Sequence, residues 1–178
     1  GGEEARGRGR VLGAGKVDAA GETCGARNVL IATGSYPARP PIPGLDLAGV
    51  VTSDEILEGP PLDYRSLVII GGGVIGVEMA SVYANLGCRV AIVEAMERIL
   101  PTMDKEISQS LAMVLKKRGI SIHTGAMVER VERAAGDQLR CHFTARGKAE
   151  AVEGEAVLVS IGRKPNTEGL FGPEVDVK

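Results

Sequence analysis

Short apolar runs alternate with helical patterns through the middle of the chain. Leu67–Ile70 is a continuous apolar run of the kind found in strands that are buried on both faces of a parallel sheet. Val74–Leu86 is apolar on nearly every side, as in a helix packed between layers. Arg89–Glu94 and Ile120–Thr124 are two further strand-like runs, separated by the amphipathic segment Asp104–Arg118. The pattern predicts a βαβαβ unit built on a parallel sheet.

The amphipathic segment is expected to be a helix with one buried stripe. Its apolar positions follow helical spacing and are Ile107, Leu111, Val114 and Leu115. Acidic residues open the segment and basic residues close it before Gly119, which complements the helix dipole at both ends.

The pattern changes after this unit. Residues 139–144 alternate apolar and polar side chains, which predicts a half-buried antiparallel strand. With Met127–Glu132 and Ala149–Glu153 this strand forms a small antiparallel β-meander, and the apolar run Ala156–Ile161 is expected to rejoin the parallel sheet. The fold class is therefore α/β, a Rossmann-type βαβαβ parallel sheet with an antiparallel meander.

Six of the nine prolines fall between Pro37 and Pro61. Proline at this density cannot continue a helix or a central strand, so the segment is interpreted as a connection between two units. Before it lie two β-prone runs, Arg10–Val17 and Ala26–Ala32, on either side of the turn-rich Asp18–Gly25.

Composition narrows the class of protein. The chain has 178 residues and a formal charge of −2, which corresponds to one domain, or one domain and part of another. The near-neutral charge gives no general attraction to nucleic acid or to an anionic membrane. No apolar run is long enough for a membrane-spanning helix, and no signal peptide is recognisable. Because the chain begins without Met, we expect it to be a processed or cut piece.

Cysteine and histidine provide no evident catalytic or metal site. Cys24, Cys88 and Cys141 have the spacing of neither a redox dithiol nor a zinc site, and we expect small buried residues in a reducing compartment, the cytoplasm. His123 and His142 have no Ser, Cys or acidic partner at motif spacing, so neither is expected to act in catalysis or to bind a metal.

A glycine-rich motif is the clearest chemical feature. Residues 71–76, Gly-Gly-Gly-Val-Ile-Gly, satisfy G-x-G-x-x-G, follow a predicted strand and open a predicted helix. An acidic residue, Glu94, follows 23 positions after the first glycine. These contexts turn a weak pattern into a dinucleotide-binding hypothesis. The alternative is an ordinary glycine-rich turn in an α/β domain that binds no nucleotide.

Each glycine of the motif has a distinct expected role. Gly71 makes the tight turn, Gly73 removes the Cβ that would hold the backbone away from a pyrophosphate, and Gly76 lets the helix pack closely on the strand. The free N–H groups of Val74 and Ile75 at the helix N-terminus then face the phosphates.

Two carboxylates accompany the motif. Glu94 ends the second strand and can accept hydrogen bonds from the adenosine ribose, which favours NAD over NADP because a 2′-phosphate would meet like charge. Arg98, four residues on, could accommodate a phosphate if it turned inward, although a solvated role is the simpler interpretation. For Glu78 two interpretations stay open, a first-turn acid stabilised by the helix dipole and a carboxylate directed at the nicotinamide.

Several motifs, in this order, resemble the class I flavin (pyridine nucleotide) disulfide oxidoreductases. They are Ile31–Ser35 with Pro37, Val68–Glu78, Val93–Glu94, and Val159–Arg163 with Pro165. Within that family, Ile99–Asp104 and Ser160–Thr167 are most similar to dihydrolipoamide dehydrogenase, while mercuric reductase and soluble transhydrogenase have similar central segments.

The resemblance implies cofactor-binding residues. The NAD pyrophosphate loop would comprise Gly71, Gly72, Gly73, Val74, Ile75, Gly76, Val77 and Glu78, with Glu78 directed toward the nicotinamide. Glu94 would hold the adenosine ribose, Val128 would flank the adenine, and Gly162 would approach the nicotinamide end. Flavin-side contacts would be Gly15, Thr33, Gly34 and Ser35.

The sequence lacks other motifs of that family, namely an N-terminal FAD G-x-G-x-x-G, a C-x-x-x-x-C redox pair and a C-terminal His–Glu pair. The expected organisation is a partial FAD-domain β segment (1–45), a Pro-rich connection (46–62), the NAD-binding domain (63–165) and the start of a return to the FAD domain (166–178). We expect no catalytic residue in this chain, NAD as its cofactor and FAD in the intact protein.

The expected function is to place nicotinamide for hydride exchange with flavin in an FAD-dependent oxidoreductase, with the fragment alone inactive. Its implied partners are NAD(H), the remaining FAD and dimerisation domains of a homodimer, and a 2-oxoacid dehydrogenase complex. Three alternatives remain: a stand-alone NAD-binding sensor module, the same domain from a mercuric reductase or soluble transhydrogenase relative, and a domain whose 32–35 strip is completed by another chain.

Overall fold

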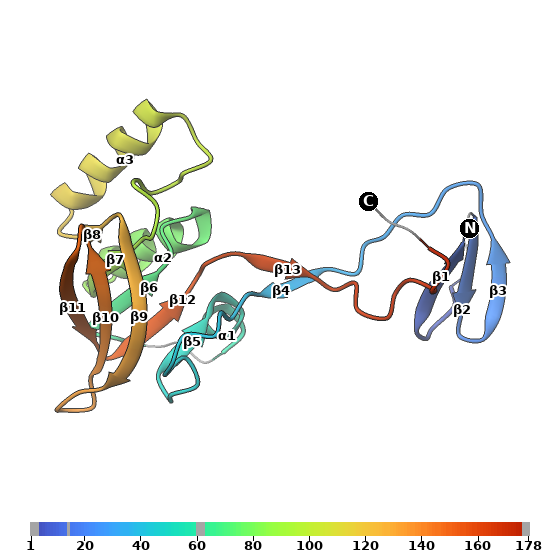
Figure 1. The fold of residues 1–178 in the computed structure, drawn as a ribbon, viewed down its shortest axis with the longest axis horizontal. Helices are drawn as coiled ribbons and strands as arrows, with labels where there is room; N and C mark the ends of the chain where they lie inside the picture. The colour runs from blue at the N-terminus through green and yellow to red at the C-terminus, as the bar shows by residue number, and fades with distance from the viewer. Residues whose placement is uncertain (1–3, 14, 60–62, 176–178) are drawn as a thin grey trace. The chain divides into compact units, whose positions relative to one another are not determined.

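The computed structural model describes residues 4–13, 15–59 and 63–175, which belong to two compact units. The larger unit is Pro37–Arg163, and the smaller combines Gly1–Tyr36 with Lys164–Lys178 (Figure 1). The chain passes between them through β4 (Ser35–Pro37) and β13 (Arg163–Pro165), which pair as a two-stranded sheet. In the described residues no helix is both long and apolar enough to cross a membrane.

A five-stranded parallel sheet forms the centre of the larger unit, in the order β5-β12-β6-β7-β8. The strands are β5 (Val50–Thr52), β6 (Ser66–Ile70), β7 (Arg89–Val93), β8 (Ser121–His123) and β12 (Ala156–Val159). Every residue of β6 is buried, as the continuous apolar run predicted. The apolar run Ala156–Ile161 rejoins the sheet, because β12 lies between β5 and β6.

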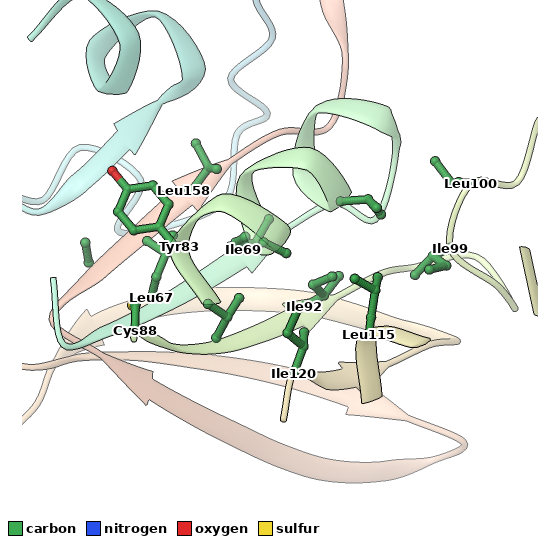
Figure 2. Packing of buried hydrophobic residues seen from close by; sticks show 14 residues of the cluster. Leu67, Ile69, Tyr83, Cys88, Ile92, Ile99, Leu100, Leu115, Ile120 and Leu158 are labelled. Atoms are coloured by element: carbon green, nitrogen blue, oxygen red, sulfur yellow. The ribbon is translucent and has the colours of Figure 1, made fainter. Parts of the chain in front are cut away.

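One face of this sheet is covered by α2 (Val74–Asn85) and α3 (Lys105–Lys117). Successive strand residues point to opposite faces, so Leu67 and Ile69 of β6 join the cluster that contains Tyr83 and Leu115 from the two helices (Figure 2). The apolar stripe expected on α3 is only partly buried. Leu115 is 1% exposed, whereas Ile107 and Val114 are 52% and 42% exposed.

The other face packs against the predicted antiparallel meander, whose order is β11-β10-β9. Its strands are β9 (Ala126–Arg133), β10 (Leu139–Ala145) and β11 (Lys148–Gly154). Leu139, Cys141 and Phe143 point inward together with Val68 and Ile70 of β6, as the alternation predicted. Burial raises the pKa of the Cys141 thiol to about 12, so this cysteine is an inert core residue.

The segment interpreted as a Pro-rich connection contributes regular structure to the larger unit. Residues 46–59 contain β5 and the short helix α1 (Ser53–Glu58), while 60–62 lie outside the described residues. A capping box starts the helix: Glu55 N–H donates to the Thr52 hydroxyl, and Thr52 N–H donates to the Glu55 carboxylate. Neither element was predicted from the sequence, although the prolines flank both and interrupt neither.

The smaller unit has a three-stranded antiparallel sheet, β1-β2-β3, formed by Gly9–Gly13, Lys16–Ala19 and Glu22–Gly25. The strand expected over 10–17 is divided near Gly15, whose φ of 69° suits glycine. The turn expected over Asp18–Gly25 is confined to Ala20 and Gly21, with strands on both sides.

Two predictions for this unit are wrong. Ala26–Ala32 is not a strand, and its Leu30 is 92% exposed, because no described segment offers it the neighbouring backbone that a strand needs for hydrogen bonds. Cys24 is exposed on β3 and not buried, since β3 is an edge strand exposed along its whole length.

Candidate functional site

A cavity of about 650 Å³ opens at the carboxyl ends of β6, β7 and β12. Ile70, Val93 and Ser160 end or follow these strands and line it, together with the loops that continue from them. The start of β9 supplies a further wall through Ala126, Met127 and Val128. Open α/β sheets bind ligands at this edge, because the loops that leave neighbouring strands diverge there.

The glycine loop after β6 forms the floor of the cavity. Gly71 has φ 108°, and a Cβ built on it would lie 2.5 Å from the Ser160 carbonyl oxygen, so no other residue fits without movement. A Cβ on Gly76 would overlap the Gly71 carbonyl and lie 2.8 Å from Ser160 Oγ. Helix α2 therefore packs closely on the strand through the last glycine, in the way the motif predicted.

Gly73 differs from its neighbours because a Cβ there would meet no described atom within 4 Å. It lines the cavity and is also the N-cap of α2, which has no side-chain cap among the described residues. The first N–H groups of any helix lack partners within that helix, and they carry the positive end of its dipole. Val74 and Ile75 line the cavity at this point. An anionic ligand can approach the backbone here.

Glu94 follows β7 and joins the two loops at the carboxyl edge of the sheet. It is 7% exposed and lines the cavity. Oε2 accepts a hydrogen bond from Gly72 N–H at 2.5 Å, and Oε1 accepts one from Met96 N–H at 2.7 Å. A carboxylate has about four acceptor positions, so it can also accept hydrogen bonds from a ligand hydroxyl. The ligand role of Glu94 stays a prediction from the sequence motif, and the contact with Gly72 was not predicted.

Ser160 is a buried residue of the cavity wall for which no sequence motif predicted a role. Its Oγ lies 3.1 Å from the Ile70 carbonyl oxygen and 3.0 Å from that of Gly71, and it donates toward both. Ser160 N–H also donates to the Ile70 carbonyl at 2.8 Å. The hydroxyl therefore joins the end of β12 to the start of the glycine loop. Ser160 and Gly71 are 89 positions apart in the sequence, which explains why spacing alone did not reveal this contact.

Apolar side chains form most of the remaining wall. Val128 is half-buried and packs against the core, whereas Met96 and Met127 are 56% and 62% exposed. Neither methionine was anticipated, because a lone methionine in a loop or strand carries no motif. The wall suits a flat apolar ring.

Two arginines near the cavity are engaged in protein contacts. Arg163 lines the cavity, and its Nη1 lies 2.6 Å from Asp54 Oδ1, a contact that holds the pKa of the Asp54 carboxyl below its usual value. Arg98 does not line this cavity. Its Nη2 donates to the Pro101 carbonyl at 2.9 Å, and its side chain borders a separate cavity of about 270 Å³ beside α3.

Some residues named from the sequence lie elsewhere. Glu78 is exposed and is the fifth residue of α2, just beyond the first turn of the helix. It is not among the described residues that line the cavity. Gly72 and Val77 are buried, Gly72 beneath Glu94 and Val77 in the core. Gly162 lines the cavity with φ 118°. Gly15, Thr33, Gly34 and Ser35 belong to the smaller unit.

Both histidines have acidic partners that sequence spacing did not reveal. His142 Nε2 lies 2.7 Å from Glu132 Oε1 on the neighbouring strand, and His123 Nδ1 lies 3.7 Å from Glu150 Oε2. Within the described part of the chain, no three His, Cys, Asp or Glu side chains are grouped as a metal site would need.

Comparison with known proteins gives consistent results. The family model described as pyridine nucleotide-disulphide oxidoreductase matches residues 3–178. A dihydrolipoyl dehydrogenase from Acholeplasma laidlawii is 42% identical over 176 residues, 96% of this chain and 51% of that protein. A mercuric reductase from Lysinibacillus sphaericus is 37% identical over 165 residues, 93% of this chain and 30% of that protein.

Solved structures agree with these sequence matches. The HOCl-induced flavoprotein disulfide reductase RclA from Escherichia coli, as its Cu(II) complex, superposes with a TM-score of 0.73 at 31% identity, covering 93% of this chain and 37% of that one. The chain thus spans about half or less of the length of the relatives it matches.

Proposed function

We propose that this chain, which belongs to the pyridine nucleotide-disulphide oxidoreductase family, binds NAD(H) in the cavity at the ends of β6, β7 and β12. The observation that carries the proposal is the pairing of an open Gly73 at the N-terminus of α2 with a buried Glu94 at the end of β7. Bound NAD would supply the nicotinamide that accepts or donates hydride, and the chain would bind and orient it.

The pyrophosphate would lie against Gly73, Val74 and Ile75. The space that a Cβ would fill at Gly73 lets phosphate oxygens reach the helix N-terminus, and the uncapped N–H groups there are suitable donors. Gly71 and Gly76 support this geometry from below, because neither position has room for a side chain.

The adenosine ribose would be held by Glu94. The hydrogen bonds from Gly72 and Met96 fix the position of this carboxylate and leave further lone pairs for the ribose hydroxyls. A 2′-phosphate would face the carboxylate, and the Arg98 side chain, which does not line this cavity, already donates to the Pro101 carbonyl. Both observations favour NAD over NADP.

The two ends of the cofactor would occupy different walls. Val128 would flank the adenine, and Gly162 would approach the nicotinamide end. Glu78 is proposed to face the nicotinamide from α2, and Gly15, Thr33, Gly34 and Ser35 are proposed as flavin-side residues. These assignments follow the family resemblance, and each is a position at which a substitution can test it.

For the whole protein we propose an FAD-dependent dihydrolipoamide dehydrogenase-like enzyme of the cytoplasm, acting as a homodimer that serves a 2-oxoacid dehydrogenase complex. In this assignment 63–165 is the NAD-binding domain, and the FAD-side segments flank it. The 42% identity to a dihydrolipoyl dehydrogenase supports this substrate class, and the 37% identity to a mercuric reductase makes that enzyme the second candidate. The chain alone is expected to bind no FAD and to leave dihydrolipoamide unoxidised.

The test is a fluorescence titration of the 178-residue chain with NADH and with NADPH, repeated on Glu94→Gln and on Glu97→Gln as the matched control. Glu97 lies in the same loop but borders the smaller cavity. We expect NADH to bind more tightly than NADPH, with the preference reduced in Glu94→Gln and retained in Glu97→Gln. Equal affinities for both cofactors, unchanged by Glu94→Gln, would overturn the specificity argument.

A further inference from the structure

Two of the exposed methionines line the main cavity, and two lie elsewhere on the surface. The chain has five, of which Met79 packs against the core and the other four are exposed. Met96 and Met127 line the main cavity. Met103 and Met113 are 44% and 60% exposed, and neither contributes to the described walls of that cavity.

Backbone hydrogen bonds hold the two cavity methionines on adjacent segments. Gly125 N–H donates to the Met96 carbonyl at 2.8 Å, and Ala126 N–H donates to the Glu94 carbonyl at 2.9 Å. The loop after β7 and the start of β9 therefore run together at the wall of the cavity. Met96 N–H also donates to Glu94 Oε1, so the backbone of one of the two methionines contacts the proposed ribose acceptor.

We propose that Met96 and Met127 form an oxidation-sensitive site that controls access of the dinucleotide to the cavity. The inference rests on the proposed function. The reactant is a two-electron oxidant of the peroxide class. A lone pair of Sδ attacks one peroxide oxygen, an S–O bond forms, the O–O bond breaks, and proton transfer leaves water. Sulfur loses two electrons to give the sulfoxide, and the peroxide gains them.

Oxidation would change the wall from apolar to polar. The thioether of methionine is flexible and packs well against a flat ring, whereas the sulfoxide carries a strong acceptor oxygen. Pressing that oxygen against an apolar ligand surface strips it of water and gives it no donor in return, which is unfavourable. A ligand that covers both sulfur atoms would in turn shield them from the oxidant.

The experiment uses the full chain in a Cys24→Ser background, because Cys24 is the exposed thiol among the described residues and would also react. Three proteins are compared: this parent, the cavity variant Met96→Leu/Met127→Leu, and the matched control Met103→Leu/Met113→Leu. Each is treated with hydrogen peroxide in the presence or absence of NAD⁺. Peptide mass mapping locates the sulfoxides, and NADH is titrated after the peroxide has been removed.

We expect oxidation to weaken NADH binding roughly tenfold in the parent and in the matched control, the size expected for one poorly compensated buried polar group. Peroxide should leave the NADH affinity of the cavity variant at the value of the same variant before treatment. In the parent, NAD⁺ should protect Met96 and Met127 from oxidation but not Met103 or Met113. Unchanged NADH affinity in the oxidised parent, or an equal loss in the cavity variant, would overturn the inference alone. Failure of the untreated parent to bind NADH would overturn the proposed function, and the inference with it.

Discussion

The side chain of Glu94 is hydrogen-bonded to the backbone of Gly72, with Oε2 lying 2.5 Å from the amide nitrogen. The contact joins the loop after β7 to the glycine loop after β6. A second bond runs in the opposite direction between the same two loops, since Leu100 N–H donates to the Gly72 carbonyl at 2.8 Å. The carboxylate proposed to hold the ribose therefore also fixes the loop proposed to hold the pyrophosphate.

Replacing Glu94 by alanine should consequently weaken both stability and binding. The change leaves the N–H groups of Gly72 and Met96 without their acceptor, and we expect it to cost about 2 kcal/mol of unfolding free energy. Urea denaturation followed by circular dichroism measures this. The control is Glu97→Ala, whose side chain borders the smaller cavity. Equal unfolding free energies for the two variants would contradict a supporting role for Glu94.

Gly73 allows binding to be separated from folding. A Cβ at this position meets no described atom within 4 Å, and the backbone is at φ −72°, which alanine adopts readily. Gly73→Ala should therefore change stability by less than about 1 kcal/mol. It should weaken NADH binding by roughly tenfold or more, because the methyl group occupies the space that a phosphate oxygen needs.

Gly71→Ala is the contrasting variant for that measurement. Its φ of 108° and the 2.5 Å approach to the Ser160 carbonyl predict a loss of folded protein in addition to a loss of binding. Thermal unfolding and NADH titration of both variants give the comparison. A Gly73→Ala protein that binds NADH as well as the unmodified chain would show that the pyrophosphate does not approach this backbone.

The strand–glycine loop–helix geometry and the place of Glu94 after the next strand could be predicted from the sequence, because both depend on residues close together in the chain. The layers of the larger unit could be predicted as well, since Leu67–Ile70 and residues 139–144 carry clear burial patterns. Ser160 could not, because its partner Gly71 is brought near only when β12 inserts beside β6.

Two predictions were incorrect for a common reason: the strand over Ala26–Ala32 and the fully buried apolar stripe of α3 both depend on neighbours that are distant in the sequence. Ala26–Ala32 has strand-like residues, but a strand forms only where another backbone is available to pair with it. Ile107 and Val114 have helical spacing, yet the rotation of α3 on the sheet buries Ser108 and leaves both exposed. The Ser108 hydroxyl donates to the Ile99 carbonyl, so a polar residue on the buried face has its partner. Local pattern gives the element, whereas packing determines which side is buried.

Acid should destabilise the larger unit partly through Asp54. Its ion pair with Arg163 holds the pKa of the Asp54 carboxyl below its usual value, so the stability it contributes is present above the pKa of an unpaired aspartate, about pH 4, and is lost as the pH falls through the lowered pKa. Asp54→Asn should therefore make the unfolding free energy depend less steeply on pH in that acidic range.

Asp46→Asn is the control, because Asp46 is exposed and forms no ion pair with any described residue. A pH dependence identical in all three proteins would show that the pair is not maintained in solution.

Two buried serines, Ser66 at the start of β6 and Ser160 directly after β12, provide the last comparison. Ser160 Oγ donates to the Ile70 and Gly71 carbonyls at the cavity, whereas Ser66 Oγ accepts from Glu155 N–H at 3.1 Å at the other end of the sheet. Each is under a tenth exposed, and each hydroxyl joins β6 to the β12 region. Replacing either serine with alanine removes one buried hydroxyl and should cost about 1 kcal/mol of unfolding free energy.

Only Ser160→Ala should also weaken NADH binding, because of the two serines only Ser160 contacts the glycine loop. Calorimetric unfolding gives the stabilities and NADH titration gives the affinities. If Ser66→Ala weakens binding as much as Ser160→Ala does, then the effect reflects general stability of the sheet and not the position of Gly71.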